Sequence, residues 1–595
     1  MAATTPLVPA TPSAITANAA AKIGGISLSF NISFKGHRLD KSGGCRATGI
    51  GGKAEEASGQ AVGDAPKHRG RDGTVNTSMD VERLEAILRR DGLAAASQRL
   101  RRAIAGTPTE GLFHMLLALA AGRVGLDDQA SRLFRLHCLI HPGDLQGYYN
   151  FGNFQLRLDQ KDEAAELFAR AALDAPLRPL AWHNRLKALT GAGRHLAAAT
   201  QAAALHRLAP LNINAALDIF VALSNAHRFA TAAGIGRCAL IAAPANARAA
   251  SNFALAAADT GAGATAIGYA KIAEILAPHD PEILTNSGVI RLKRGDFKGG
   301  WAGWAHRAKP APVVTDRRGR QPAALTAGAL DGARLVILGE QGIGDHLIFA
   351  ICLGQVARRA AEVNFVIGDR LYDFFSRAFP RVRFLRESAM RAANYHLDRA
   401  VDFQIAFGDL PGVCGLFVGH YPSTAWFAGD AAESARLRDR LRKAYGDRRF
   451  IGVSWRSKSP RDGHFRSIAP RQLGAAAFPA DAVLVILQYE ATTAELDQLA
   501  AASGRPIARF DEIDIYSDFW TLGNLIRALD EIVTTPNVTN ILAGVCGQPT
   551  QLLLPYASHW CWGIDEDRSF WFPATRVHRC GAEETWADVI GRLTF

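Results

Sequence analysis

Residues Arg334–Phe349 read RLVILGEQGIGDHLIF, and the character of the chain changes twice within them. Arg334–Leu338 is mostly apolar and β-branched, which predicts a buried parallel strand. A turn follows, shaped by Gly339, Gln341, Gly342 and Gly344. An apolar helical pattern begins after it. Strand, glycine turn and helix form the first half of a βαβ unit, in which ligands bind at the carboxyl ends of the strands.

Asp345 follows the last glycine of this turn. It is therefore expected either to cap the helix or to stand at a ligand site, and the residues of the turn alone do not favour one role. The glycines do not form the G-x-G-x-x-G dinucleotide fingerprint, and no G-K-[ST] follows them. The turn therefore predicts neither NAD nor ATP binding.

Strands and helices continue to alternate as far as the C-terminus. Glu362–Ile367 and Val401–Ala406 are predicted strands of the first α/β half, residues 333–447. Ile451–Trp455 and Val483–Leu487 are predicted strands of a second half, residues 448–595. Two such halves imply a cleft between domains, where ligands are often bound.

A fixed period governs residues 79–312, where prolines recur every 34 residues: Pro142, Pro176, Pro210, Pro244, Pro278 and Pro312. This is the tetratricopeptide period, with two helices in each repeat, and proline ends the second helix. We therefore predict an α-solenoid whose concave groove binds an extended partner. Trp301 and Trp304 at its end are expected to seal the solenoid onto the following domain rather than to hold a ligand.

The remaining segments differ in composition. Residues 1–78 are rich in Ala, Gly, Ser and Thr and are predicted to be disordered. Residues 313–332 are rich in Pro, Ala and Arg and are predicted to be a linker. The predicted fold class is thus an α-solenoid followed by a pair of Rossmann-type α/β domains.

Charge and cysteine content restrict the possible partners. The net charge is +12, but only 21% of residues are charged and no dense Lys/Arg run predicts nucleic-acid binding. The eight cysteines form no C-x-x-C pair, so the sequence predicts neither a metal site nor a disulfide framework. Scattered cysteines are typical of a reducing compartment, which favours the cytoplasm. No apolar run is long enough to span a membrane.

A basic loop follows the first strand of the second half, with its cations at Arg456, Lys458 and Arg461. Arginine binds phosphate through two parallel hydrogen bonds, and lysine acts as a point charge. Cations at the carboxyl end of a strand suit a phosphorylated donor. A solvated basic loop is the alternative interpretation.

A predicted helix starts at Asn537-Val538-Thr539, directly after a predicted strand. The free N–H groups of a helix N-terminus attract a phosphate, and Asn537 and Thr539 are placed to add side-chain hydrogen bonds. The alternative is ordinary capping of the helix by Asn537.

Several segments together resemble bacterial tetratricopeptide-repeat glycosyltransferases. The segments are GEQGIGDHLIFA, DFQIAFGDLPG, IGVSW, NVTNILAGVCGQPTQLLLP and DRSFWFPATRV. The catalytic region of that family looks like the lipopolysaccharide heptosyltransferases (glycosyltransferase family 9), which have the GT-B fold. The resemblance covers about residues 339–577, and the repeats extend it over most of the chain after Met79.

The resemblance implies transfer of a sugar from a nucleotide sugar to a protein or glycan recruited by the repeats, with no metal and no resident cofactor. Asp345 matches the proposed catalytic base. Arg456, Lys458 and the helix start at Asn537–Thr539 match the groups that hold the donor's phosphates. The chain departs from the family at Ile541, where relatives carry histidine, and at Pro536, where they carry aspartate. These departures favour an alternative, a protein-binding scaffold with a degenerate, inactive transferase domain.

Overall fold

The computed structural model describes residues 22–23, 26–27, 77–105, 112–174, 178–208, 213–309, 312–415, 425–459, 462–564, 567–581 and 584–595. The chain divides into two compact units, Met1–Asn184 and Arg185–Phe595. Nearly all of the segment predicted to be disordered, residues 1–78, lies outside the described residues. Two short strands within it, β1 (Lys22–Ile23) and β2 (Ile26–Ser27), pair antiparallel.

The first unit is built from paired helices. They are α1 (Thr77–Ile104), α2 (Phe113–Arg123), α3 (Asp127–Ile140), α4 (Leu145–Arg157), α5 (Lys161–Ala171) and the first half of α6 (Arg178–Gly191). Gly92, with φ of 80°, divides α1 into two helices. Small residues let the helices approach closely: a Cβ on Gly152 of α4 would lie 2.8 Å from the buried ring of Phe168 in α5.

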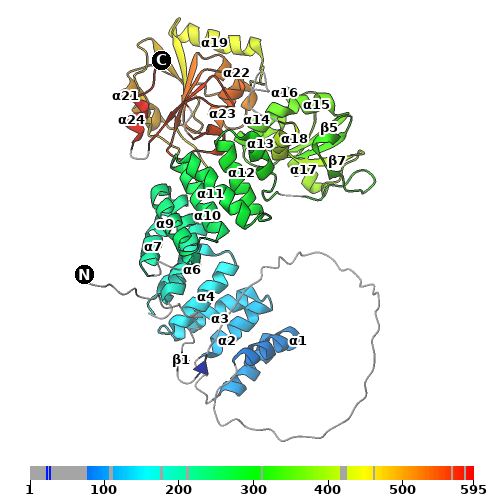
Figure 1. Ribbon diagram of the computed structural model, residues 1–595, viewed down its shortest axis with the longest axis vertical. Coiled ribbons are helices and arrows are strands. Elements are labelled where there is room, and N and C mark those ends of the chain that lie inside the picture. The colour runs from blue at the N-terminus through cyan, green and yellow to red at the C-terminus, as the bar shows by residue number, and fades with distance from the viewer. Residues whose placement is uncertain are drawn as a thin grey trace, which may run out of the picture. The chain divides into compact units, whose positions relative to one another are not determined.

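The helical repeat continues in the second unit, where α10, α11 and α12 lie side by side (Figure 1). The complete helices are α7 (His195–Leu208), α8 (Ile213–Asn225), α9 (Phe229–Ala242), α10 (Ala247–Asp259), α11 (Gly263–Leu276), α12 (Pro281–Lys293) and α13 (Phe297–Trp304). First helices start at residues 213, 247 and 281 and second helices at 229, 263 and 297. Both series advance by 34 residues, which confirms the predicted helix-pair repeat.

One residue in the turn between the paired helices has a left-handed backbone. This residue also recurs every 34 positions: Gly125, Asp159, Gly193, His227, Gly261 and Gly295. Glycine adopts this conformation without steric cost. Asp159 and His227 are the exceptions, with φ of 62° and 56°.

The last helix of the solenoid is built into the core of the α/β region. Trp301 and Trp304 of α13 are buried and their ring centroids lie 5.6 Å and 5.9 Å from that of Trp560. Trp301 also packs edge-on against Phe349, in the helix that ends the opening stretch. The two tryptophans therefore seal the solenoid onto the α/β region, as predicted.

The first α/β half contains a five-stranded, wholly parallel sheet. Its strand order is β3-β7-β4-β5-β6. The strands are β3 (Ala323–Ala324), β4 (Arg334–Leu338), β5 (Glu362–Ile367), β6 (Arg383–Arg386) and β7 (Phe403–Ala406). The connecting helices are α14 (Ile343–Phe349), η3 (Ala350–Cys352), α15 (Leu353–Arg359), α16 (Asp369–Ala378), α17 (Glu387–Ala392), η4 (Phe407–Asp409) and α18 (Leu410–Val413). The chain reverses direction across the sheet between β4 and β7, so the turn after β4 stands at the switch point where such sheets bind ligands.

The segment expected to be a linker, residues 313–332, contributes to this first half. It contains β3, which extends the sheet beside β7, and the short helix η2 (Ala327–Ala329). Val314, Asp316 and Leu330 are fully buried. Its apolar positions pack into the domain, although its Pro/Ala/Arg composition is typical of an exposed connector.

The second half contains a six-stranded parallel sheet of order β10-β9-β8-β11-β12-β13. Its strands are β8 (Arg449–Ser454), β9 (Ala482–Ile486), β10 (Ile507–Ala508), β11 (Glu531–Thr534), β12 (Thr550–Leu554) and β13 (Thr575–Arg579). The helices are α19 (Ala431–Tyr445), which leads into the sheet, α20 (Pro470–Gly474), α21 (Thr493–Ser503), α22 (Phe519–Arg527), α23 (Val538–Val545), η5 (Trp560–Trp562) and α24 (Trp586–Ile590). Here the reversal lies between β8 and β11, so the basic loop and the helix start at Asn537 both follow the switch-point strands.

Two parallel α/β sheets therefore follow a helical repeat, in agreement with the predicted fold class at that level. Within the described ranges, no helix combines the length and the apolar character needed to cross a membrane.

Candidate functional site

The turn after β4 brings Asp345 to the start of α14. Gly339 is required by a close approach, because a Cβ there would lie 2.9 Å from the carbonyl oxygen of Val366 in β5. Gln341 has a left-handed backbone, with φ of 66°. The Gly342 N–H donates to Oδ2 of Asp345 at 3.2 Å. Asp345 thus caps its own helix with one carboxylate oxygen.

The second oxygen of Asp345, Oδ1, takes no part in this cap. Oδ1 is buried and has no hydrogen-bond partner among the described residues, although 16% of the Asp345 side chain is exposed. His559, in the loop after β12, places Nε2 3.9 Å from this oxygen. Helix α14 packs against α23 of the other half, and a Cβ on Gly344 would lie 3.5 Å from Cγ1 of Ile541. The structure therefore brings Asp345 and the helix that starts at Asn537 to one place, where the two halves meet.

Glu340, between two residues of the predicted turn, points inward. Its carboxylate is buried and forms an ion pair with Arg307, which follows α13. Arg307 also pairs with Asp409 at 2.5 Å, and the Gly408 N–H donates to Glu340 at 3.0 Å. This network fixes the turn beneath Asp345. Sequence reasoning missed it, since the only signal was an acidic residue between Gly339 and Gln341.

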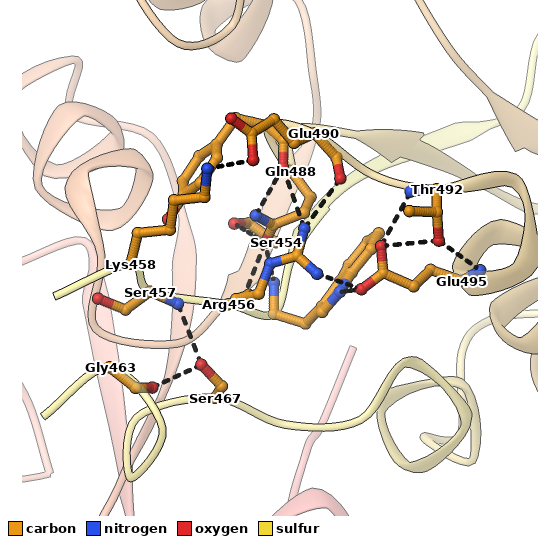
Figure 2. A network of polar contacts seen from close by, with 12 residues as sticks. Ser454, Arg456, Ser457, Lys458, Gly463, Ser467, Gln488, Glu490, Thr492 and Glu495 are labelled. Carbon is orange, nitrogen blue, oxygen red and sulfur yellow. Dashed lines mark hydrogen bonds and ion pairs between the residues drawn. The ribbon is translucent and has the colours of Figure 1, made fainter. Parts of the chain in front are cut away.

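Two cations of the predicted basic loop already have carboxylate partners (Figure 2). Arg456 forms an ion pair with Glu495, and Lys458 forms one with Glu490. Arg456 also donates from Nη2 to the Glu490 carbonyl at 2.9 Å. The charges of Arg456 and Lys458 are therefore balanced inside the second half.

Burial of Glu495 acts to raise the pKa of its carboxyl group. Hydrogen bonds from Thr492 and the charge of Arg456 act in the opposite direction and prevail, so the pKa lies below its usual range. Glu495 is therefore ionised at neutral pH and holds Arg456.

Main-chain groups at the end of β8 are also satisfied internally. The N–H groups of Trp455 and Arg456 donate to Oε1 of Gln488 at 3.0 Å and 2.8 Å. The predicted residue Arg461 lies outside the described residues. Arg466, farther along the loop, forms an ion pair with Asp462.

The predicted helix start at Asn537–Thr539 lies beside this loop. Asn537 is the N-cap of α23, and its Oδ1 accepts from the Asn540 N–H at 3.2 Å. Its Nδ2 donates to Oγ of Ser454 at 2.8 Å, which joins the ends of β11 and β8. Val538 opens the helix, and the Thr539 hydroxyl is buried and donates to the Leu487 carbonyl at 3.5 Å. The side chains of Asn537 and Thr539 therefore make internal contacts. The Asn540 N–H is taken by the cap, so the N–H groups of Val538 and Thr539 are the ones suited to a phosphate.

No cluster of three or more His, Cys, Asp or Glu side chains suited to hold a metal ion occurs within the ranges that the structure describes. The polar groups at the two switch points are Asp345 in the first sheet and Arg456, Lys458 and the first turn of α23 in the second, and His559 approaches Asp345 from the loop after β12. This set suits proton transfer and anion binding.

Comparison with known proteins gives a limited result. No family model matches the chain. Protein FlbA of Caulobacter vibrioides is 27% identical over 321 residues, which cover 51% of this chain and 53% of FlbA. The chain thus spans about half the length of this curated relative.

Solved structures similar to this chain include MamA, YrrB and PilF. The alignment with MamA covers 29% of this chain and 98% of the MamA chain, at 18% identity and a TM-score of 0.26. YrrB, described as a TPR protein with an unusual peptide-binding site, covers 32% and 97%, at 16% identity and a TM-score of 0.28. PilF of Pseudomonas aeruginosa covers 35% and 94%, at 19% identity and a TM-score of 0.27. Likeness at this level says nothing about what the present chain binds.

Proposed function

We propose that this protein is a metal-independent glycosyltransferase that moves a sugar from a nucleotide sugar to a protein or glycan acceptor held by its helical repeats. The observation that carries the proposal is the meeting of α14 and α23. It gathers a carboxylate and a helix N-terminus from the switch points of two parallel sheets.

In the proposed reaction, Asp345 accepts the proton of the acceptor hydroxyl while the oxygen attacks the anomeric carbon of the sugar. Negative charge then builds on the departing diphosphate. The first turn of α23 stabilises that charge through its N–H groups and its dipole. Arg456 and Lys458 contribute once the diphosphate displaces Glu495 and Glu490.

The acceptor is proposed to lie in the groove of the repeats. A solenoid of this period presents a continuous concave surface to an extended chain. The cytoplasm, where nucleotide sugars are made, remains the predicted location.

The test is transfer from ADP-, UDP-, GDP- and CMP-sugars, compared between the wild type and Asp345→Asn. Asp373→Asn is the matched control. The Asp373 side chain is 80% exposed, and among the described residues its one ion pair is with Arg386. We expect Asp345→Asn to lose at least about 100-fold in kcat, the usual size of a general-base contribution, and the control to retain wild-type activity.

Specific observations favour a second candidate, a protein-binding scaffold with an inactive transferase domain. Glu490 and Glu495 already neutralise the loop cations, and the apolar Ile541 faces the helix of Asp345. If none of the four nucleotide sugars raises the melting temperature and the wild type is as inert as Asp345→Asn, the scaffold is the correct function.

A further inference from the structure

His559 and Asp345 approach each other from different halves of the α/β region. The Nε2–Oδ1 distance of 3.9 Å is longer than a hydrogen bond. Catalytic hydrogen bonds are often long in unliganded proteins and tighten when the substrate binds. About a third of the His559 side chain is exposed. Asp345 Oδ2 is engaged by the Gly342 N–H, which leaves Oδ1 as the oxygen that His559 meets.

The Cys561 thiol lies beside His559. Nδ1 of the imidazole lies 3.3 Å from Sγ of Cys561, and either group can be the donor. Burial raises the pKa of Cys561 well above its ordinary value, so the thiol keeps its proton and can donate it to Nδ1. With the thiol as donor, the ring proton resides on Nε2, on the side of the Asp345 carboxylate.

The loop that carries His559 is clamped on both sides. Arg579 of β13 donates to Oγ of Ser558 at 2.6 Å and to the carbonyl oxygen of Trp562 at 2.9 Å. Trp560 is buried against Trp301 and Trp571. His559 therefore stands on a rigid segment, which is what a residue that orients another side chain requires.

We propose that His559 is a positioning residue for Asp345: its Nε2–H holds Oδ1 and turns a free lone pair of the carboxylate toward the acceptor hydroxyl. The inference rests on the proposed function. In the transfer step, the acceptor oxygen bonds to the anomeric carbon and the bond to the diphosphate oxygen breaks. The diphosphate leaves with the electron pair of that bond, and the hydroxyl proton moves to Asp345.

Ile541 of α23 also lies beside the turn of Asp345, with Cγ1 3.5 Å from the place of a Cβ on Gly344. Its side chain is apolar and cannot hydrogen-bond to the carboxylate. His559 approaches Oδ1 of Asp345 from the loop after β12.

Several charges act on the His559 imidazole. Burial is the largest influence and lowers its pKa, as do the charges of Arg466 and Lys293, whereas Asp345 and Asp462 raise it. The ring is therefore mostly neutral at pH 7, and one of its two nitrogens carries the proton.

The first experiment measures the pair without any substrate. The full chain is labelled with ¹³C at histidine Cε1, the His559 signal is identified by its loss in His559→Gln, and its pH titration is followed. In Asp345→Asn we expect the pKa of His559 to fall by about one pH unit, because the opposite charge nearby is removed. An unchanged titration would overturn the pairing and leave the proposed transferase function untouched.

The tautomer is tested in the same samples by a matched pair of substitutions. Cys561→Ser keeps a donor to Nδ1 and should keep the proton on Nε2, whereas Cys561→Ala should mix the tautomers, as read from ¹⁵N shifts of the ring. Equal tautomer populations in both variants would contradict the role of the thiol.

The second experiment applies to transfer activity. His559→Leu removes the donor and should lower kcat about tenfold or more, the value of a hydrogen bond to a charged group. His559→Gln, whose amide Nε2 keeps a donor near the same place, should recover part of that loss. His279→Gln, at an exposed position of the solenoid, is the control. Equal kcat in His559→Leu and wild type would overturn the inference, whereas a wild type without activity would overturn the proposed function instead.

Discussion

One residue in the turn of each of six helical repeats adopts a left-handed backbone, and the identity of this residue affects the free energy of unfolding. At Gly261 φ is 76° and no other group fills the space beside Cα. Gly261→Ala should therefore destabilise the protein by about 1 kcal/mol through backbone strain alone. Gly268→Ala, within α11 and equally unobstructed, is the control and should stabilise by about 0.5–1 kcal/mol. Urea unfolding of both variants measures the difference, and equal effects would contradict the argument.

His227 occupies this turn position, where four of the six repeats have glycine. Its ring stacks on Phe465 in the second α/β half, with centroids 3.9 Å apart and planes within 3°. Neither ring nitrogen has a hydrogen-bond partner among the described residues. Burial, helped by the charge of His464, lowers the pKa of His227 to about 4. The stack therefore depends on a neutral imidazole.

Acid should accordingly destabilise the protein at this residue. The unfolded chain binds the proton near pH 6.5 and the folded chain only near pH 4. Stability is thus fully present above pH 6.5 and is lost as the pH falls from 6.5 toward 4. His227→Asn tolerates the left-handed backbone and does not titrate, so its melting temperature should fall less over this window. Part of the slope should remain, because His578 also has a pKa of about 4; an identical slope would refute the assignment.

At the scale of elements, the turn after β4 depends on a buried carboxylate. Glu340→Gln would leave Arg307 with Asp409 alone in the interior. Removing one partner of a buried pair typically costs about 3–5 kcal/mol. Glu387→Gln, from an exposed pair with Arg391, should cost at most about 0.5 kcal/mol. Chemical denaturation followed by tryptophan fluorescence compares the two, and a small cost for Glu340→Gln would mean that water reaches Arg307.

The sequence predicted the helices and strands that have a local pattern, but it did not predict which side chains form ion pairs between these elements. The run RLVIL and the glycine turn define β4 and α14, and the spacing of prolines defines the repeat. β13 was missed, because TRVHR holds a single apolar residue, Val577, among polar and charged ones. The partner of Arg456 is Glu495, 39 residues away. Its ion pair depends on the packing of β8 beside β9, and His559 meets Asp345 only because two halves fold together.

At the scale of the molecule, the end of the solenoid and both sheets share one hydrophobic core. That core includes Trp301, Phe349, Val485 and Trp571, from α13 and from both α/β halves. Trp301→Ala should therefore cost about 3–5 kcal/mol, as large-to-small core changes do. Amide hydrogen exchange should accelerate together in α12, β4 and β12, because these elements unfold as one unit. Acceleration confined to α12 and α13 would show that the solenoid unfolds separately.

If the basic loop holds the donor diphosphate, as we propose, its two glutamates make it selective for charge. A monovalent anion that reaches Arg456 or Lys458 offers no more than Glu495 and Glu490 already supply, and it must also displace them. A diphosphate brings at least two charges and several acceptor oxygens on one molecule, so only such an anion gains by the exchange. In the proposed role the protein carries its own competitor for the loop, and we expect chloride and monovalent carboxylates to be excluded by the same pairs that a nucleotide sugar would open.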